Sequence, residues 1–340
     1  MKTEEIQSKL ALLSSSDQEL VLRQLDCLFK ELEIDVLGIQ EEIKESESRH
    51  CPHCSSSKTV KSGKEHGVQR FLCRGCKHYF RSNTGSFNAR FRKGKGELLK
   101  LYLRHFLSAK SIRYCATACG ITIATSFKWR HRILSALQKQ QDNKLLEGIV
   151  ESDDVFVAYS QKGQRNLQRP GKKRGKGMFE PKSRGISDEK VAIIISNDRK
   201  GGNHLQVATR GRISENNLTE VLKGKIVSES ILCSDSHPSY IAFAKSNKIE
   251  HKTIRAKDKK YIKEGKYHIQ HVNHSAKELK EWLEIFNGVS TKYLQNYLNW
   301  FSVKKRLDNA KVPLKELSVL LCSSWDAIQC LKNIPNLSYI

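Results

Sequence analysis

Two Cys-x-x-Cys motifs restrict the folding of this chain more than any other sequence feature, and they are formed by Cys51, Cys54, Cys73 and Cys76. The motifs are separated by 18 residues. At this spacing four thiolates close a tetrahedral site around one zinc ion, because each motif offers two sulfurs from one tight turn. We therefore predict a zinc ribbon whose metal is structural, with four protein ligands and no open coordination position.

The residues around the cysteines agree with this interpretation. Residues 68–72, between the motifs, predict a strand, and Gly75 is expected to take the positive φ that a tight turn needs. Cysteines scattered by chance in a core would not form two matched motifs. Disulfides are rare in intracellular proteins, the class that the N-terminal sequence indicates.

The chain carries a large excess of positive charge. It has 60 Lys and Arg against 36 Asp and Glu, a formal net charge of +24 in 340 residues. This balance favours a polyanionic partner, nucleic acid first and an anionic membrane second. No apolar run approaches the roughly 18 residues of a membrane span, and residues 1–5 lack the features of a secretory signal. We expect an intracellular protein of two or three domains that does not enter a membrane.

Changes in composition and periodicity divide the chain into five expected segments. They are a helical N-terminal segment at 1–47, the zinc ribbon at 48–85, a helix-turn-helix DNA-binding region at 96–140, an α/β domain at 148–305 and a helical C-terminal tail at 306–340. The expected fold is therefore multidomain, with small DNA-binding modules before one larger α/β domain.

The helix-turn-helix prediction rests on residues 111–132. A first helix is predicted over 111–119 and a basic, hydroxyl-rich second helix over 122–132, with Gly120 at the turn. A plain helical hairpin is the alternative, but the adjacent ribbon and the net charge favour DNA contact. The residues expected to bind DNA here are Lys128, Arg130 and Arg132, together with Arg92 in the basic linker before this region.

The α/β domain is predicted from a change to short apolar runs. Strands are predicted over 148–157, 191–196, 205–208, 230–233 and 250–254, and helices over 214–222, 238–246 and 272–286. This order is compatible with the ribonuclease-H-like fold. A Gly- and Lys-rich stretch at 169–177 is expected to be a mobile loop that binds nucleic acid through Lys172, Lys173 and Arg174, although an idle solvated loop is the alternative.

Two aspartates lie at the ends of predicted strands of this domain. Asp153 is near the end of the first strand and Asp235 is just past the end of a later one. Paired carboxylates on neighbouring strands can hold two divalent ions that stabilise the attacking and leaving oxygens of a phosphodiester. Oxygen ligands and phosphate partners suit Mg²⁺ or Mn²⁺. Most aspartates are solvated surface residues, but placement at strand ends favours a catalytic site.

Several short stretches carry a family resemblance. They are Asp153–Phe156, Arg184–Val191, Leu232–His237 and His268–Asn273, followed by Trp282, Phe286 and Gly288–Leu294. Together they resemble bacterial insertion-sequence transposases that have an N-terminal zinc ribbon and an ISXO-like catalytic domain of the DDE class. Each stretch alone is short, but the combination is specific. The resemblance runs from about Cys51 to Phe301.

The resemblance implies a ribonuclease-H-like catalytic domain with a metal site. Asp153 and Asp235 would be its two metal-binding aspartates, and Asn273 would be the family's asparagine on the late helix. Asp154 stands where the family usually has Glu, and its side chain is one methylene shorter.

Ala276 is a larger departure from the family pattern. Relatives usually place Glu, His or Lys three residues after the position of Asn273, whereas alanine can neither bind metal nor move a proton. Two substitutes are His274 and Glu278, which point about 100° and 140° away from Asn273 on a helix. A site that works without either is the third possibility, so the resemblance leaves catalytic activity open at this position.

The function implied by the resemblance is DNA transposition. Such an enzyme binds the terminal inverted repeats of its element, hydrolyses one phosphodiester at each end, and joins the 3′ hydroxyl to target DNA. The implied partners are double-stranded DNA and a second copy of the chain, as a homodimer or a larger synaptic complex in the bacterial cytoplasm, at the nucleoid. The alternatives are a catalytically silent DNA-binding derivative and a ribonuclease-H-like nuclease that cuts without joining.

Two periodic patterns near the end of the domain each have a structural and a functional interpretation. One pattern is a series of histidines: His268, His271 and His274. These side chains could form a metal-binding face, but phosphate contact or polar packing is favoured, because the first histidine precedes the predicted helix. An aromatic stripe is expected to pack in the core, with base stacking as the alternative: Tyr293, Tyr297 and Trp300.

Overall fold

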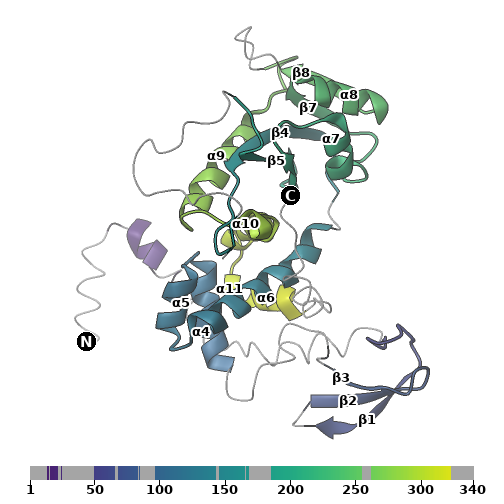
Figure 1. The fold of residues 1–340 in the computed structure, drawn as a ribbon, viewed down its shortest axis with the longest axis vertical. Helices are drawn as coiled ribbons and strands as arrows, with labels where there is room; N and C mark the ends of the chain where they lie inside the picture. Colours follow the sequence, from purple (N-terminus) through teal and green to yellow (C-terminus); the bar gives the residue numbers. More distant parts are fainter. Residues whose placement is uncertain are drawn as a thin grey trace. The chain divides into compact units, whose positions relative to one another are not determined.

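The computed structural model describes most of the chain (Figure 1). The described residues are 14, 16–21, 24, 50–65, 68–82, 84, 96–142 (side chains of 139–142 excepted), 145–164, 166–167, 185–254 and 262–322. They fall into two compact units, with boundaries after Ala136 and after Lys304. No helix in these ranges is long and apolar enough to cross a membrane.

Some predictions fall outside the described residues. The DNA contacts predicted for Arg92, Lys172, Lys173 and Arg174 lie there, as do most of segment 1–47 and the tail after residue 322. Within segment 1–47, residues 16–21 are helical, as predicted.

The first unit contains a small antiparallel sheet. Its strands are β1 (Thr59–Glu65), β2 (Val68–Cys73) and β3 (Tyr79–Arg81), in the order β1-β2-β3. β2 is the strand predicted between the two cysteine motifs. Phe71 and Phe80 pair across β2 and β3, with ring centroids 5.5 Å apart. A three-stranded sheet with so small a core needs a further source of stability.

The first unit also contains, in whole or in part, the helices α4 (Gly96–Leu107), α5 (Ile112–Ala118), α6 (Ile123–Asp142) and α11 (Pro313–Cys322). α5 begins after Ser111, whose Oγ accepts a hydrogen bond from the Tyr114 backbone N–H at 3.2 Å. The turn between α5 and α6 uses Gly120 at φ 59°. The two helices and the turn therefore lie where the helix-turn-helix pattern predicted them.

The C-terminal segment returns to this helical region. α11 contacts α4, and its leucines on one face are fully buried: Leu314, Leu317 and Leu321. The part of the predicted tail that the structure describes is therefore helical, and it packs as an element of the first unit.

The second unit is built on a mixed five-stranded sheet. Its strands are β4 (Ile149–Ala158), β5 (Lys190–Asp198), β6 (Asn203–Arg210), β7 (Ile231–Asp235) and β8 (Glu250–Ile254). Their order in the sheet is β6-β5-β4-β7-β8. The β4–β5 and β5–β6 pairs are antiparallel, whereas β4–β7 and β7–β8 are parallel. All five predicted strands are present, so the α/β prediction is confirmed.

Helices cover both faces of this sheet (Figure 1). α7 (Glu215–Leu222) and α8 (Pro238–Ser246) bury Leu218 and Phe243 against Val150 and related sheet residues, forming the main core. α9 (Gln270–Glu284) contacts β4 and β5. Because successive strand residues point to opposite faces, each residue of β4 faces either the α7–α8 side or the α9 side.

The end of the second unit is an aromatic cluster between α9 and α10 (Leu294–Asp308). Trp282 of α9 packs edge-on against Trp300, with ring centroids 5.2 Å apart, and contacts Tyr297 at 6.1 Å. Trp300 is fully buried and Tyr297 nearly so. Core packing, the interpretation favoured from the sequence, is thus confirmed for these two members of the aromatic stripe.

Candidate functional site

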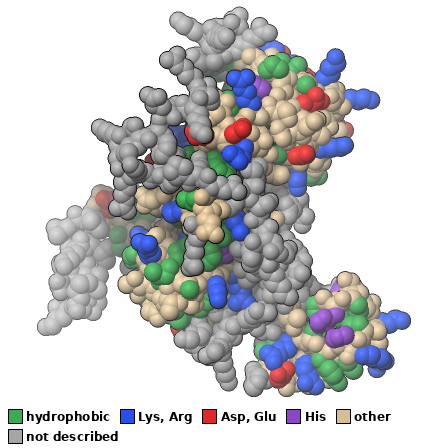
Figure 2. Space-filling view, in the orientation of Figure 1, with side chains coloured by type: hydrophobic (Ala, Val, Ile, Leu, Met, Phe, Trp, Pro, Cys, Tyr) green, Lys and Arg blue, Asp and Glu red, His purple; other side chains and the backbone are tan. Residues whose placement is uncertain are grey.

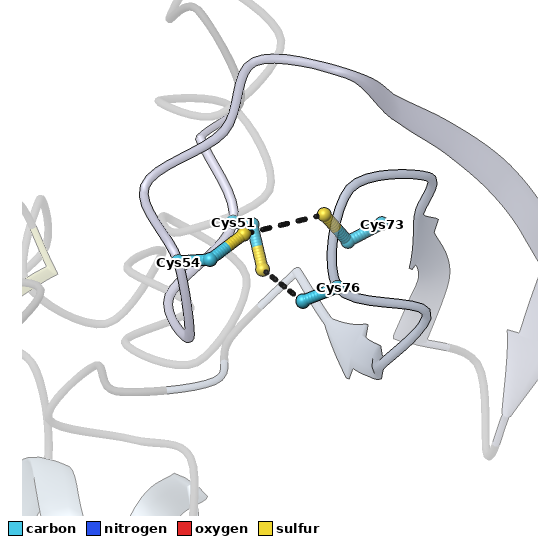
Figure 3. Close-up of side chains that lie close together, drawn as sticks. All are labelled: Cys51, Cys54, Cys73 and Cys76. Atoms are coloured by element: carbon cyan, nitrogen blue, oxygen red, sulfur yellow. Dashed lines mark hydrogen bonds between the residues drawn. The ribbon is translucent and has the colours of Figure 1, made fainter.

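The four motif cysteines of the ribbon converge on one point (Figure 3). The Sγ atoms of Cys51 and Cys76 lie 3.6 Å apart, and so do those of Cys54 and Cys73. A tetrahedral site with Zn–S bonds of about 2.3 Å has edges of about 3.8 Å, so the donor set fits a zinc ion closely. In the metal-free cluster the backbone N–H of Cys76 lowers the pKa of Cys73 to about 6, whereas burial and the neighbouring cysteines raise the pKa of Cys76 to about 12.

The turns that present these cysteines differ from the prediction in one respect. Positive φ occurs at Ser55 (58°) and Lys77 (59°), each directly after the second cysteine of a motif. Gly75 does not adopt positive φ, so that prediction was wrong. Gly75 matters for close approach instead, because a Cβ there would lie 3.3 Å from Ser56.

On the five-stranded sheet, two aspartates stand side by side. The parallel β4–β7 ladder ends with Glu151 opposite Cys233, and the same register carried two residues further sets Asp153 beside Asp235. Asp235 is the last residue of β7. Asp153 lies in the middle of β4, because β4 continues to pair with β5 up to Ala158. The prediction that Asp153 lies near the strand's end was therefore wrong, but both aspartates stand where β4 and β7 separate.

The acids in this region are electrostatically crowded. Burial, together with the nearby charges of Asp154 and Asp235, raises the pKa of Asp153 to about 6. Burial and the charge of Asp235 likewise raise the pKa of Asp154 to about 6. Asp154 points to the opposite face of the sheet from Asp153, because neighbouring strand residues alternate. Half-buried carboxylates with raised pKa values are typical of a site that binds cations or protons.

Asn273 lies near the start of α9 and is exposed. Among the described residues no hydrogen bond joins its side chain to Asp153 or Asp235; its backbone N–H donates to Ile269. Ala276 is buried at 7% exposure, so it packs on the inner side of α9. α9 contacts the same sheet that carries the two aspartates.

The two possible substitutes for Ala276 pair with each other. His274 Nε2 lies 3.5 Å from Glu278 Oε1, in an i,i+4 pair on the outer part of α9. This pairing directs both side chains along the helix surface. It agrees with their predicted angles away from Asn273.

Two residues near the aspartates were not anticipated from the sequence. Lys280 of α9 is close enough for its charge to lower the pKa of Asp153, against the larger effect of burial. Glu151, two residues before Asp153 on β4, is 1% exposed and meets His268 and His271. The i,i+2 spacing of Glu151 and Asp153 was the available sequence signal, because it places both on one face of a strand.

The histidine series of the sequence is divided by the structure. α9 begins at Gln270, so His268 precedes the helix as expected. The ligand atoms of Glu151, His268 and His271 lie within 4.8 Å of one another, whereas His274 faces Glu278. The three histidines therefore do not form one metal-binding face.

In the helix-turn-helix region, one predicted DNA contact is exposed and two are buried. Lys128 is exposed on α6. Arg130 is fully buried, donates to the Lys110 carbonyl at 2.6 Å, and lies 5.2 Å from the centre of the Phe106 ring. Arg132 is buried at 7% exposure. The predictions for Arg130 and Arg132 were wrong, because these guanidinium groups belong to the interior of the fold.

A family model matches the α/β domain. Residues 145–304, which include both aspartates and α9, match the model described as the ISXO2-like transposase domain. A curated relative from Halobacterium salinarum, described as an uncharacterized protein in transposable element ISH50, is 23% identical over 262 residues. The matched region covers 76% of this chain and 85% of that relative.

Solved structures of Mos1 transposase complexes also resemble the chain weakly. A pre-cleavage Mos1 transpososome is 11% identical with a TM-score of 0.26, covering 94% of this chain and 97% of that chain. A Mos1 strand transfer complex is 13% identical with a TM-score of 0.27, covering 97% and 99%. Residues 145–304 of this chain match the ISXO2-like transposase domain, and the sequence matches support an insertion-sequence transposase of this family.

Proposed function

We propose that this chain is a DNA transposase and that its α/β domain is ribonuclease-H-like. The observation that carries the proposal is the pair Asp153 and Asp235, set side by side where β4 and β7 separate, inside the residues that match the transposase family. The sheet order supports the fold assignment, because three antiparallel strands are followed by two parallel ones.

The aspartate pair fits Mg²⁺ or Mn²⁺. Its donors are carboxylate oxygens, which these cations prefer. Burial first, and then the charges of Asp154 and Asp235, raise the pKa of Asp153, so its ionised form is one that a bound cation would stabilise. Bound divalent ions would supply stabilisation of the charge that develops on the attacking and leaving oxygens of a phosphodiester. Asp153 and Asp235 would bind and orient the ions, and Asn273 would contribute a neutral amide oxygen from α9.

The proposed substrate is double-stranded DNA, at the terminal inverted repeats of a mobile element and at the target. The net charge of +24 supports a polyanionic partner. Lys128 on α6 would contact phosphates, and the same role is proposed for a set of basic residues in the linker and the long loop: Arg92, Lys172, Lys173 and Arg174. Basic side chains also surround the visible face of the β1–β3 sheet (Figure 2), which we propose grips the backbone, with structural zinc held by its four cysteines.

Transposition joins two element ends, so the active form is proposed to be a homodimer or a larger assembly. Each copy would bring one end to the site on its own sheet. The reaction would take place on DNA inside the cell, in the cytoplasm.

A second candidate, a DNA-binding protein derived from a transposase, is favoured by one observation. Ala276 packs inward on α9 in the position where relatives carry an ionisable side chain, and the two side chains considered as substitutes, His274 and Glu278, pair with each other. Such a protein would bind element ends without cutting them.

The two candidates separate in an assay on labelled duplex that carries the inverted repeat flanking the gene, with Mg²⁺ or Mn²⁺. A transposase gives metal-dependent nicks at the element end, and Asp153→Asn abolishes them. Glu147→Gln is the matched control, because Glu147 is an exposed acid that pairs with Lys200 at the surface. Specific binding of the repeat without nicks in either metal would exclude the enzyme and leave the DNA-binding derivative.

A further inference from the structure

Glu151 is not among the residues proposed to bind metal ions or DNA. Glu151 lies on β4, faces α9, and has a side chain only 1% exposed. A buried carboxylate is costly unless charged or hydrogen-bonding partners surround it. Its partners therefore indicate what the residue does.

One carboxylate oxygen of Glu151 caps the start of α9. Oε2 accepts hydrogen bonds from the backbone N–H groups of His271 at 2.9 Å and Val272 at 3.3 Å. These belong to the first turn of the helix, whose N–H groups have no partner within the helix. Ile269 at the N-cap position makes no side-chain hydrogen bond and the first turn contains no acid. His268 Nδ1 accepts only from the Gln270 backbone N–H, at 3.3 Å, so the chain next to the helix provides no acceptor for His271 and Val272. A carboxylate on another strand takes that place, where negative charge is favoured.

The other carboxylate oxygen of Glu151, Oε1, contacts residues at the end of β5 and at the start of α9. Oε1 lies 2.7 Å from His271 Nδ1, 3.4 Å from His268 Nδ1 and 3.3 Å from the guanidinium of Arg199. Arg199 directly follows β5, and His268 precedes α9. The contacts of Glu151 thus join β4, the end of β5 and the start of α9.

The strand next to β4 holds α9 in a second place. Asn197 of β5 pairs with Glu151 in the sheet, and its Nδ2 donates to Ser275 Oγ at 2.8 Å. The first two turns of α9 are therefore bound to adjacent positions of the sheet on either side of the β4–β5 ladder.

A metal ion is the other way to explain a Glu151, His268 and His271 cluster. The arrangement of hydrogen-bond donors argues against it. Both oxygens of Glu151 already accept donors, and the Arg199 guanidinium balances the carboxylate charge at 3.3 Å. A cation bound at Oε1 would be repelled by that guanidinium.

We propose that Glu151 is a positioning residue that fixes the first turn of α9 to β4 and so sets where Asn273 stands relative to Asp153. The proposal rests on the proposed function for the role of those two residues. Asp153 is two residues from Glu151 along β4, and Asn273 is the next residue after the two amides that Glu151 binds. A shift of this turn moves Asn273 directly, because its own N–H closes the first helical hydrogen bond, to Ile269, at 3.1 Å.

The first measurement is amide hydrogen exchange of the full-length, zinc-loaded protein. Glu151→Gln keeps the shape of the side chain and removes its charge, and Glu147→Gln is the matched control on an exposed acid. We expect exchange at His271, Val272 and Asn273 to rise about tenfold or more in Glu151→Gln, with the β4–β5 amides still protected. Unchanged exchange at these three amides would overturn the proposal, whether or not the protein is active.

The second measurement is nicking of the labelled element end by the same variants. Partners that orient metal ligands typically change activity by 10–100-fold, so we expect Glu151→Gln to nick about 10–100-fold more slowly with unchanged affinity for the end. Faster exchange together with wild-type nicking would overturn the positioning role. If the wild-type protein does not nick at all, the proposed function fails, and the exchange result still decides whether Glu151 orders the turn that carries Asn273.

Metal content provides a third test. We expect one zinc per chain, in both the wild type and Glu151→Gln. A second equivalent of zinc in the wild type that is lost in Glu151→Gln would show a metal site at this cluster and contradict the proposal.

Discussion

The ribbon and the acidic site of the sheet are both candidate metal sites, yet they are assembled in opposite ways. The ribbon collects four cysteines from two turns that lie close together in the sequence, and their sulfurs already have the spacing of a zinc tetrahedron. The acidic site collects Asp153 and Asp235 from two parallel strands, and its third predicted member, Asn273, comes from a helix that another residue holds in place.

This difference has a physical consequence. The ribbon has a small core, so we expect bound zinc to supply much of the stability of its folded state. The sheet has a large core of its own, built on α7 and α8. The fold can therefore tolerate crowded acids that lower its stability when no cation is bound. One site is therefore expected to use metal for folding, and the other for chemistry.

The largest expected effect is on the ribbon. Removing zinc with a chelator, or replacing Cys73 with Ser, should unfold the β1–β3 sheet, because structural zinc contributes about 10–16 kcal/mol of apparent binding free energy in small zinc domains. The β4–β8 sheet should remain folded. Resolved amide signals in an NMR spectrum check both statements. Two results would remove the distinction between the two sites: a ribbon that keeps its amide signals after zinc removal, or a β4–β8 sheet that unfolds together with the ribbon.

The helix-turn-helix region provides a second contrast, between a buried and an exposed basic residue. Arg130→Ala should lower the free energy of unfolding by about 1.5–3 kcal/mol, because it removes the hydrogen bond from the charged guanidinium to the Lys110 carbonyl. Lys128→Ala should leave stability within about 0.5 kcal/mol and reduce the slope of DNA affinity against salt by about 1. Denaturation and binding titrations at several salt concentrations measure the two effects.

The opposite outcome would reassign the two side chains. If Arg130→Ala weakened DNA binding without changing stability, the guanidinium would have to leave the interior on binding.

The smallest expected change concerns the pH dependence of the metal-free sheet. The pKa of Asp153 is raised from 3.8 to about 6 in the folded protein, so the folded state holds this proton more tightly than the unfolded state. Stability from this group is therefore greatest below about pH 4 and is lost as pH rises to about 6. Asp153→Asn should raise the free energy of unfolding by about 1–3 kcal/mol at pH 7.5, and by progressively less as the pH falls from about 6 to about 4.

Urea denaturation of the metal-free protein across this pH range measures the effect, with Glu147→Gln as the control. Added Mg²⁺ should stabilise the wild type and not Asp153→Asn. A variant that is less stable than the wild type at pH 7.5 would mean that Asp153 is not held under electrostatic strain.

The sequence predicted those parts of the molecule that depend on local patterns. The ribbon cysteines, the helix bounds around Gly120 and all five strands of the sheet follow from spacing and periodicity, and they were found where expected. The α9 boundary was also close, because its apolar residues repeat with helical spacing.

The errors came from contacts between distant residues. Arg130 looks like a DNA ligand in a basic helix, and only the packing of α4 and α5 around it shows that it is buried. The role of Glu151 depends on a helix that begins 119 residues later, with Ile269 at its N-cap. Neither a charge pattern nor a motif in one segment contains that information, because each depends on which elements meet in the fold.

The most direct test of the account is joining of a pre-cleaved element end, with its 3′ hydroxyl already free, to a target plasmid in Mn²⁺. This isolates the transesterification from end cleavage. We predict joined product with the wild type and with Glu147→Gln, and none with Asp153→Asn or Asp235→Asn. Failure of the wild type to join a bound end in either Mn²⁺ or Mg²⁺ would contradict the claim that the paired aspartates form a phosphoryl-transfer site.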